Sequence, residues 1–160
     1  MKIFLYFKTQ WWGDRYVGLN IIFPNANWRD DGIKVNEKLY QNENEMSWYR
    51  HLVSFNASGS HPLVMQTWAS EKWAEFIEAL PSDEVQSVIG QMVVKSFSNH
   101  FPNVEEPVKM KKSDWCLSPF SRGAYTNLVM GSRVTDVKIV AERLPRGPEP
   151  VSSLDSLDLH

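Results

Sequence analysis

The 160-residue sequence contains one cysteine, Cys116, and four histidines that have no close Cys or His neighbours. A single cysteine excludes an internal disulfide framework, and none of these residues stands at the spacing of a zinc site. We therefore predict a protein of a reducing compartment with no bound metal. We expect a cytoplasmic location, with peroxisomal and nuclear locations left open.

Excess basic charge and long apolar runs are also lacking. The 17 Lys and Arg residues stand against 19 Asp and Glu residues, for a formal net charge of -2. Phosphate backbones and anionic membranes attract proteins with excess positive charge, so we expect no nucleic-acid partner. No stretch approaches the ~20 apolar residues that cross a bilayer. We predict no membrane span, and we expect no signal peptide because the N-terminal apolar run lacks a cleavage site.

The sequence has no GxGxxG motif among its eight glycines. That motif opens the helix on which the pyrophosphate of a dinucleotide rests. The phosphate cradle of a dinucleotide site is therefore not expected from this chain.

The first half of the sequence is rich in short segments with β-branched and aromatic residues. Such segments between turn residues are typical of strands, and they occupy residues 2–7, 17–23, 48–55 and 63–68. The simplest interpretation pairs the first two strands with each other. Residues 24–46 carry turn signals and little periodicity, which predicts a long irregular connection.

The first strand has a clear alternation. Side chains on a strand point to opposite faces in turn, so Lys2, Phe4 and Tyr6 should share one face. The remaining residues, Ile3, Leu5 and Phe7, should share the other.

From Ser70 onward the apolar period changes to that of a helix. Trp73, Phe76, Ile77 and Leu80 stand at i, i+3, i+4 and i+7, which predicts a short amphipathic helix that Pro81 ends. A second helix should follow at once, capped by Ser82 and ending before Pro102. Its expected buried stripe is Val85, Val88, Ile89, Met92, Ser96 and Phe97. A further strand is predicted at residues 108–111.

Strands, then two consecutive helices, then another strand predict an α+β fold with a mixed, largely antiparallel sheet flanked by the two helices. The apolar content of 42% is enough for one core. We therefore predict one domain over residues 1–144. Residues 145–160 are rich in Pro, Ser and Asp and are expected to form a flexible tail.

The stretch SDWCLSPFSRGAYTNLVMG at residues 113–131 resembles a signature of the flavin-containing amine oxidases. KIFLYF followed by a Trp precedes it and is similar to a strand and turn of that family. WYRHLVSF, LVMQTWASEKW and the Asp-Glu-Val of the second helix follow in the family's order and are similar to its spermine oxidase branch. The resemblance covers residues 2–145. It implies the substrate-binding domain of such an enzyme.

The family uses FAD to oxidise an amine, and the resemblance assigns roles to residues of this chain. A hydride passes from the carbon beside the nitrogen to the flavin, and oxygen then yields peroxide. Lys2 matches the catalytic lysine that holds a water against the reactive ring nitrogen of the flavin. Trp115 and Phe120 match cofactor-binding aromatics, and Tyr125 matches the aromatic that flanks the substrate amine. Lys2, Trp115 and Tyr125 should open on one concavity. Without the resemblance, Lys2 would be a solvated terminal residue, and Trp115 and Phe120 would be core residues.

The family's Gly-rich βαβ unit and its last flavin-binding segment have no counterpart in this sequence. The resemblance therefore implies a fragment that is inactive alone, with a small-molecule amine as substrate and a missing FAD-binding domain as partner. The alternative is a non-catalytic binding module, which would use an aromatic-lined face for a cationic ligand or a partner protein.

Overall fold

The computed structural model describes residues 1–24, 26–52, 54–121, 123, 133, 135 and 138. The chain divides into two compact units, Met1–Ala124 and Tyr125–His160, and the fold below is that of the first. The predicted boundary between residues 144 and 145 lies outside the described residues and stays a prediction. None of the described helices is long and apolar enough to cross a membrane.

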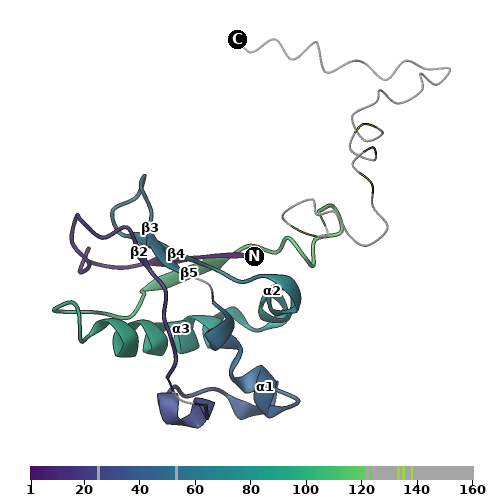
Figure 1. Ribbon diagram of the computed structural model, residues 1–160, viewed down its shortest axis with the longest axis horizontal. Helices are drawn as coiled ribbons and strands as arrows, with labels where there is room; N and C mark the ends of the chain where they lie inside the picture. The colour runs from purple at the N-terminus through teal and green to yellow at the C-terminus, as the bar shows by residue number, and fades with distance from the viewer. Residues whose placement is uncertain are drawn as a thin grey trace. The chain divides into compact units, whose positions relative to one another are not determined.

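The first unit is built on a five-stranded sheet with the strand order β2-β3-β4-β1-β5 (Figure 1). All neighbouring strands are antiparallel. The strands are β1 (Lys2–Tyr6), β2 (Gly18–Leu19), β3 (Phe55–Ala57), β4 (Val64–Trp68) and β5 (Lys109–Lys112). The predicted α+β class with a largely antiparallel sheet is confirmed.

The predicted pairing of the first two strands is wrong. β1 lies between β4 and β5, while β2 pairs with β3. The segment after β1 does not return as a hairpin because Trp11 and Trp12 are buried beside Phe7, with ring centroids 5.6 Å and 5.3 Å from it. These aromatic contacts carry the chain away from the edge of β1.

The predicted strand at residues 48–55 is also wrong over most of its length. Trp48–His51 forms a 3-10 helix, η3, and only the end of the segment enters β3. Trp48 and Tyr49 are adjacent yet both fully buried. A strand with one solvated face would place two adjacent side chains on opposite faces, whereas a helical turn can direct both inward.

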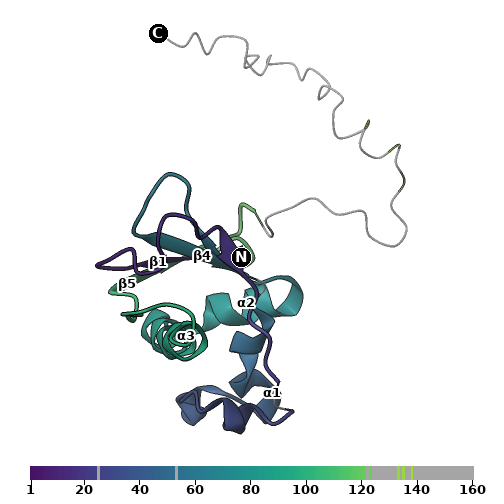
Figure 2. The same cartoon turned by 60° about the vertical axis from the view of Figure 1, so that its left-hand side comes forward.

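Two consecutive helices, α2 (Glu71–Ala79) and α3 (Ser82–Phe97), confirm the predicted pair. Both lie on the same side of the sheet (Figure 1 and Figure 2). The buried residues of α3 include Val85, Val88, Ile89, Met92 and Phe97 of the predicted stripe. The remaining helical segments are η1 (Trp28–Asp31), η2 (Glu37–Leu39), α1 (Glu43–Met46) and η3.

The core lies between the sheet and these two helices, and β1 supplies its centre. Ile3, Leu5 and Phe7 are buried, whereas Lys2 and Phe4 are only partly buried, which confirms the predicted alternation. A fully buried aliphatic or aromatic side chain contributes roughly 1.5–3 kcal/mol. The face of β1 that carries Lys2 is therefore set by the face that must be buried.

The predicted irregular connection, residues 24–46, is anchored at Asp31. Its side chain is 4% exposed and accepts hydrogen bonds from Arg50 Nε and Nη2, each at 2.7 Å, and from the Tyr49 hydroxyl at 2.9 Å. A carboxylate and a guanidinium in this two-bond geometry form a strong, directional pair. The connection is thus attached to the η3 turn that precedes β3.

We predict that Asp31→Asn lowers the free energy of unfolding by about 3 kcal/mol, because it leaves the Arg50 guanidinium facing a neutral group in a partly buried site. Asp30→Asn is the matched control, since Asp30 is exposed in the same turn and surface changes usually stay within about 0.5 kcal/mol. Urea unfolding monitored by circular dichroism measures both. Equal losses in the two variants would contradict the assigned anchor.

Candidate functional site

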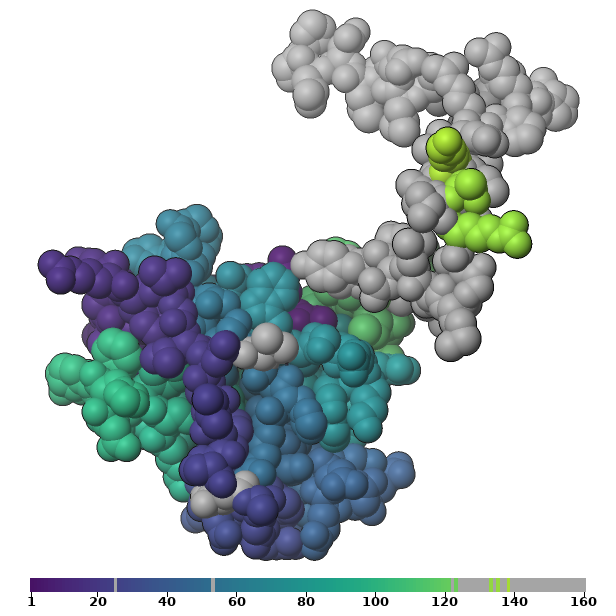
Figure 3. All heavy atoms as spheres, viewed as in Figure 1, coloured from purple at the N-terminus to yellow at the C-terminus, as the bar shows by residue number. Residues whose placement is uncertain are grey.

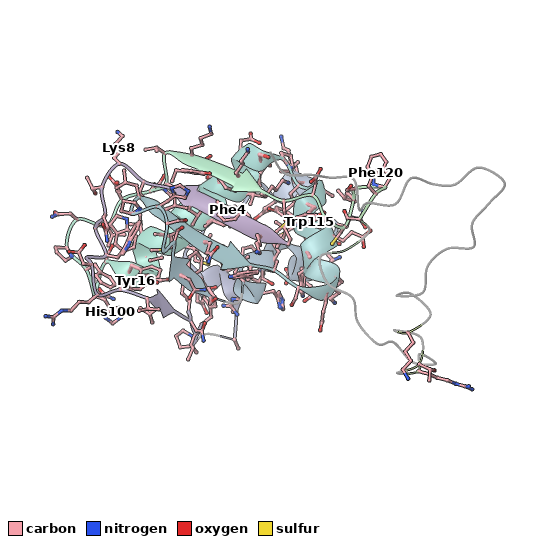
Figure 4. The ribbon with its side chains drawn as sticks, turned by 90° about the horizontal axis from the view of Figure 1, so that it is seen from above. Phe4, Lys8, Tyr16, His100, Trp115 and Phe120 are labelled. Carbon is pink, nitrogen blue, oxygen red and sulfur yellow. The ribbon has the colours of Figure 1, made fainter. Side chains whose placement is uncertain are left out.

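The sheet face turned away from α2 and α3 carries a groove, here called the sheet groove, with a volume of about 1010 Å³. Its floor includes Lys2 and Phe4 of β1, Gln66 of β4 and Lys111 of β5, and its wall is the 58–63 loop between β3 and β4. In the space-filling view this loop stands out as a protrusion (Figure 3), and Phe4 lies on β1 in the middle part of the sheet (Figure 4). Among the described residues that line the groove there are two lysines and no Asp or Glu, so it suits a neutral or anionic group.

Lys2 lies at the first position of β1, opposite Trp68 of β4. Its Nζ is 4.5 Å from the centre of the Trp68 ring, a cation–π contact worth roughly 0.5–2 kcal/mol. Its backbone is tied to Ser113: the Lys2 N–H donates to Ser113 Oγ at 2.9 Å, and the Ser113 N–H donates to the Lys2 carbonyl at 2.9 Å. Lys2 is therefore held at a defined position on the groove side of the sheet.

Residues 114–121, here called the aromatic turn, follow directly after Ser113. The Trp115 carbonyl accepts hydrogen bonds from Ser121 Oγ at 3.0 Å and from the Gly123 N–H at 2.8 Å. Trp115 is 46% exposed and Phe120 is 97% exposed, so neither is the core residue that composition alone would suggest. Both lie at one end of the sheet, opposite the end that carries Tyr16 and His100 (Figure 4).

The structure brings the aromatic turn to the end of the sheet where β1 begins at Lys2, because Ser113 links Lys2 to the turn. Trp115 is not among the residues that line the sheet groove. Lys2 and Trp115 therefore lie at the same end of the sheet but do not both line the groove. The reason is that the chain leaves the sheet after β5. Tyr125 lies outside the described residues, and the roles assigned to Lys2, Trp115, Phe120 and Tyr125 stay predictions.

Two charged residues contribute contacts beneath the aromatic turn that the sequence did not predict. Glu78, in α2, is 7% exposed, and its Oε2 accepts hydrogen bonds from the N–H groups of Cys116 at 2.9 Å and Leu117 at 3.1 Å. Lys112 donates from Nζ to the carbonyls of Ile77 at 2.9 Å, Glu78 at 2.8 Å and Leu80. A lysine at the end of a helix satisfies the carbonyls that have no partner within the helix.

One sequence signal pointed to Glu78. It lies four residues after Ala74 on the buried side of α2, where an acidic side chain needs a partner. Lys112 carried no such signal, because alternate residues of an edge strand are commonly charged.

Burial and charge change the ionisation of two groups around Glu78. Burial lowers the pKa of Lys112, and the Glu78 carboxylate opposes this change. Burial raises the pKa of the Cys116 thiol, and the Glu78 carboxylate raises it further. Both side chains therefore report on the presence of the Glu78 charge.

Among the described residues, no group of three or more His, Cys, Asp or Glu side chains could hold a metal ion. The features that could face a cofactor are the Lys2 ammonium group and the exposed rings of the aromatic turn. A planar ring with a charged edge fits such a surface, because aromatic faces stack and a cation attracts negative charge.

Comparisons with known proteins identify relatives. A model of the family described as "Flavin containing amine oxidoreductase" matches residues 1–150. The human "Peroxisomal N(1)-acetyl-spermine/spermidine oxidase" is 24% identical over 146 residues, which cover 90% of this chain and 27% of the relative. "Polyamine oxidase 1" of Oryza sativa subsp. japonica is 30% identical over 103 residues, 64% of this chain and 20% of the relative. "Lysine-specific histone demethylase 1 homolog 1" of the same plant is 25% identical over 122 residues, 76% of this chain and 14% of the relative.

The chain thus spans 27% of the length of the human relative. The family match extends over most of the 160 residues and includes both Lys2 and the aromatic turn. It confirms the resemblance inferred from the sequence: the chain belongs to the family of flavin-containing amine oxidoreductases.

Proposed function

We propose that this chain supplies the substrate side of an FAD-dependent oxidase of polyamines or similar amines, which releases peroxide. The observation that carries the proposal is Lys2 on the groove side of the sheet, tied through Ser113 to the exposed aromatic turn, in a chain that matches the family over residues 1–150. Because this chain covers only a small part of its relatives, the activity of the whole protein is proposed as well.

The described residues fit one part of FAD and not another. The Lys2 cation and the exposed rings of Trp115 and Phe120 suit the isoalloxazine ring. The sequence offers no Gly-rich turn before a helix for the pyrophosphate. The cofactor would therefore take its phosphate contacts from an FAD-binding domain and its ring contacts in part from this chain.

FAD, when bound, supplies the redox chemistry by accepting a hydride from the carbon beside the amine nitrogen and delivering electrons to oxygen. The chain's own contribution is electrostatic and steric. Lys2 places a positive charge on the groove side, and the exposed rings of Trp115 and Phe120 would exclude water from a flavin ring that stacks on them. Tyr125 is the proposed aromatic beside the substrate amine, where its ring face would attract a cation.

The substrate class is proposed from the relatives. The human relative is named as an N(1)-acetyl-spermine/spermidine oxidase and one rice relative as a polyamine oxidase, whereas another rice relative is named for a histone demethylase. We favour polyamines because the blocks WYRHLVSF and LVMQTWASEKW resemble the spermine oxidase branch of the family. The expected cytoplasmic location stays a prediction, and the name of the human relative favours the peroxisomal alternative.

A non-catalytic binding module is the second candidate, and the aromatic floor of the sheet groove supports it. Phe4 and Tyr6 line the groove together with Leu63 and Val64. Two lysines and no carboxylate stand among the described lining residues, which disfavours a cationic ligand there. This candidate is therefore limited to a partner protein.

The fit to the flavin ring alone predicts that this chain binds riboflavin and FAD with the same weak affinity, with Kd values on the order of 1 mM. Lys2→Met and Trp115→Ala should each weaken both ligands by about threefold to tenfold, because each contact is worth about 1 kcal/mol. Lys8→Met is the control, since Lys8 lies at the other end of the sheet (Figure 4). Equilibrium dialysis measures all four proteins. FAD binding a hundredfold tighter than riboflavin, or no saturable binding, would refute the predicted ring site.

Amine oxidation is tested in a chimera, in which residues 1–150 of this chain replace the aligned segment of the human relative. We expect the chimera to release peroxide with N(1)-acetyl-spermine or spermine, and Lys2→Met to lower kcat by roughly 10²-fold, as expected when one electrostatic group at a reacting centre is lost. Lys8→Met again serves as control. A chimera that binds FAD but oxidises none of the polyamines would contradict the proposed substrate class.

A further inference from the structure

Glu78 is a buried carboxylate that the proposed chemistry does not use. Its Oε2 accepts two hydrogen bonds, from the consecutive N–H groups of Cys116 and Leu117. Its Oε1 is buried and has no hydrogen-bond partner among the residues that the structure describes. Burying a charged group is costly unless its hydrogen bonds repay the lost hydration, so these two contacts need an explanation.

We propose that Glu78 is a positioning residue that acts through the aromatic turn, holding Trp115 and Phe120 at the sheet end where Lys2 begins. The link between this position and a flavin rests on the proposed function. The positioning itself rests on the contacts between α2 and the turn.

The hydrogen bonds around the turn divide into two groups. Ser118 N–H donates to the Asp114 carbonyl at 2.9 Å and Ser121 Oγ donates to the Trp115 carbonyl at 3.0 Å, so these bonds shape the turn internally. The two bonds to Glu78 instead attach the middle of the turn to α2. Two successive N–H groups that point to one oxygen form an anion-binding nest, and a charged acceptor makes each bond about twice as strong as a neutral one.

The helix that carries Glu78 is itself fixed to the sheet. Lys112, the last residue of β5, donates to the carbonyls of Ile77, Glu78 and Leu80 at the end of α2. Glu78 therefore projects from a part of α2 whose position relative to β5 is set by Lys112. Because β5 pairs with β1, the turn, the helix end and the strand of Lys2 are connected by hydrogen bonds.

A purely structural role predicts something different from a positioning role. Loss of a residue needed only for the core would lower the free energy of global unfolding. It would leave the turn unaffected under conditions in which the protein stays folded. The turn exposes much of Trp115 and nearly all of Phe120, so its release should cost little core burial. Local opening without global unfolding is then the expected consequence of losing Glu78.

Cys116 is a native probe of this opening, because it is the only cysteine in the sequence and its N–H binds Glu78. We would measure the rate of its reaction with a disulfide reagent as a function of pH in the unmodified chain, Glu78→Ala, Glu78→Gln and Glu75→Ala. Glu75 is the control because it is exposed on the same helix. The midpoint of each profile reports the thiol pKa, and the plateau at high pH, where the thiolate is fully formed, reports access to the sulfur.

Glu78→Ala should raise the plateau rate by about tenfold or more, since the loss of charge-assisted hydrogen bonds increases the open population by at least that factor. Glu78→Gln should raise it by a smaller factor, because the amide oxygen can still accept. All three variants should lower the pKa of Cys116, because both Glu78 and Glu75 raise it. Only the plateau separates them, since Glu75→Ala should leave it within about twofold of the parent value. If Glu78→Ala does not fold, the comparison of Glu78→Gln with Glu75→Ala remains decisive.

An unchanged plateau in the Glu78 variants, with only the midpoint lowered, would overturn the positioning role, because the charge would then be lost without release of the turn. Flavin titration of the same proteins separates this proposal from the proposed function. A higher plateau in the Glu78 variants together with no flavin binding by the parent chain would refute the ring site of the proposed function and leave the role of Glu78 intact. Unchanged plateaus with intact flavin binding would refute the role of Glu78 alone.

Discussion

The alternation of side chains along β1 is the constraint on which the rest of the structure depends. β1 is flanked by β4 and β5, so its buried face must meet α2 and α3 while its other face is left to the groove. A slip of one residue would exchange Lys2 with Ile3 and put an ammonium group into the core. Burial of Ile3, Leu5 and Phe7 therefore determines which side of the sheet carries Lys2. The position of the candidate site is a consequence of how the core is packed.

The parts of the fold that could be predicted from the sequence are those with a local cause. The period of β1 and the stripe of α3 can be read from neighbouring residues, and the structure has both. The partner of β1 could not be predicted, because it depends on where Trp11 and Trp12 find their contacts. The η3 turn was missed for a similar reason: Trp48 donates its indole N–H to the Tyr40 hydroxyl at 3.0 Å. That contact comes from a connection with no periodic pattern of its own.

The candidate site divides in the same way. Lys2 and the aromatic turn came from a resemblance between motifs, and no local pattern would have joined residues 111 positions apart in the sequence. Glu78 was missed because an acidic residue on a helix usually lies on a solvated face. Its partners come 38 and 39 residues later. A charged residue on the apolar side of a short helix is the one local signal of such a contact, and it gives no indication of the partner.

The aromatic turn and the sheet are stabilised by different forces. The sheet is held by burial, and a turn with Phe120 almost fully exposed gains little from burial. Directional hydrogen bonds must order it instead, and the carboxylate of Glu78 provides two of them. A domain that covers Trp115 and Phe120 would add the missing burial and would bind the ordered turn more tightly than the open one. Under the proposed function, the order of this turn and the binding of the flavin-bearing domain are thus coupled, because each favours the same conformation.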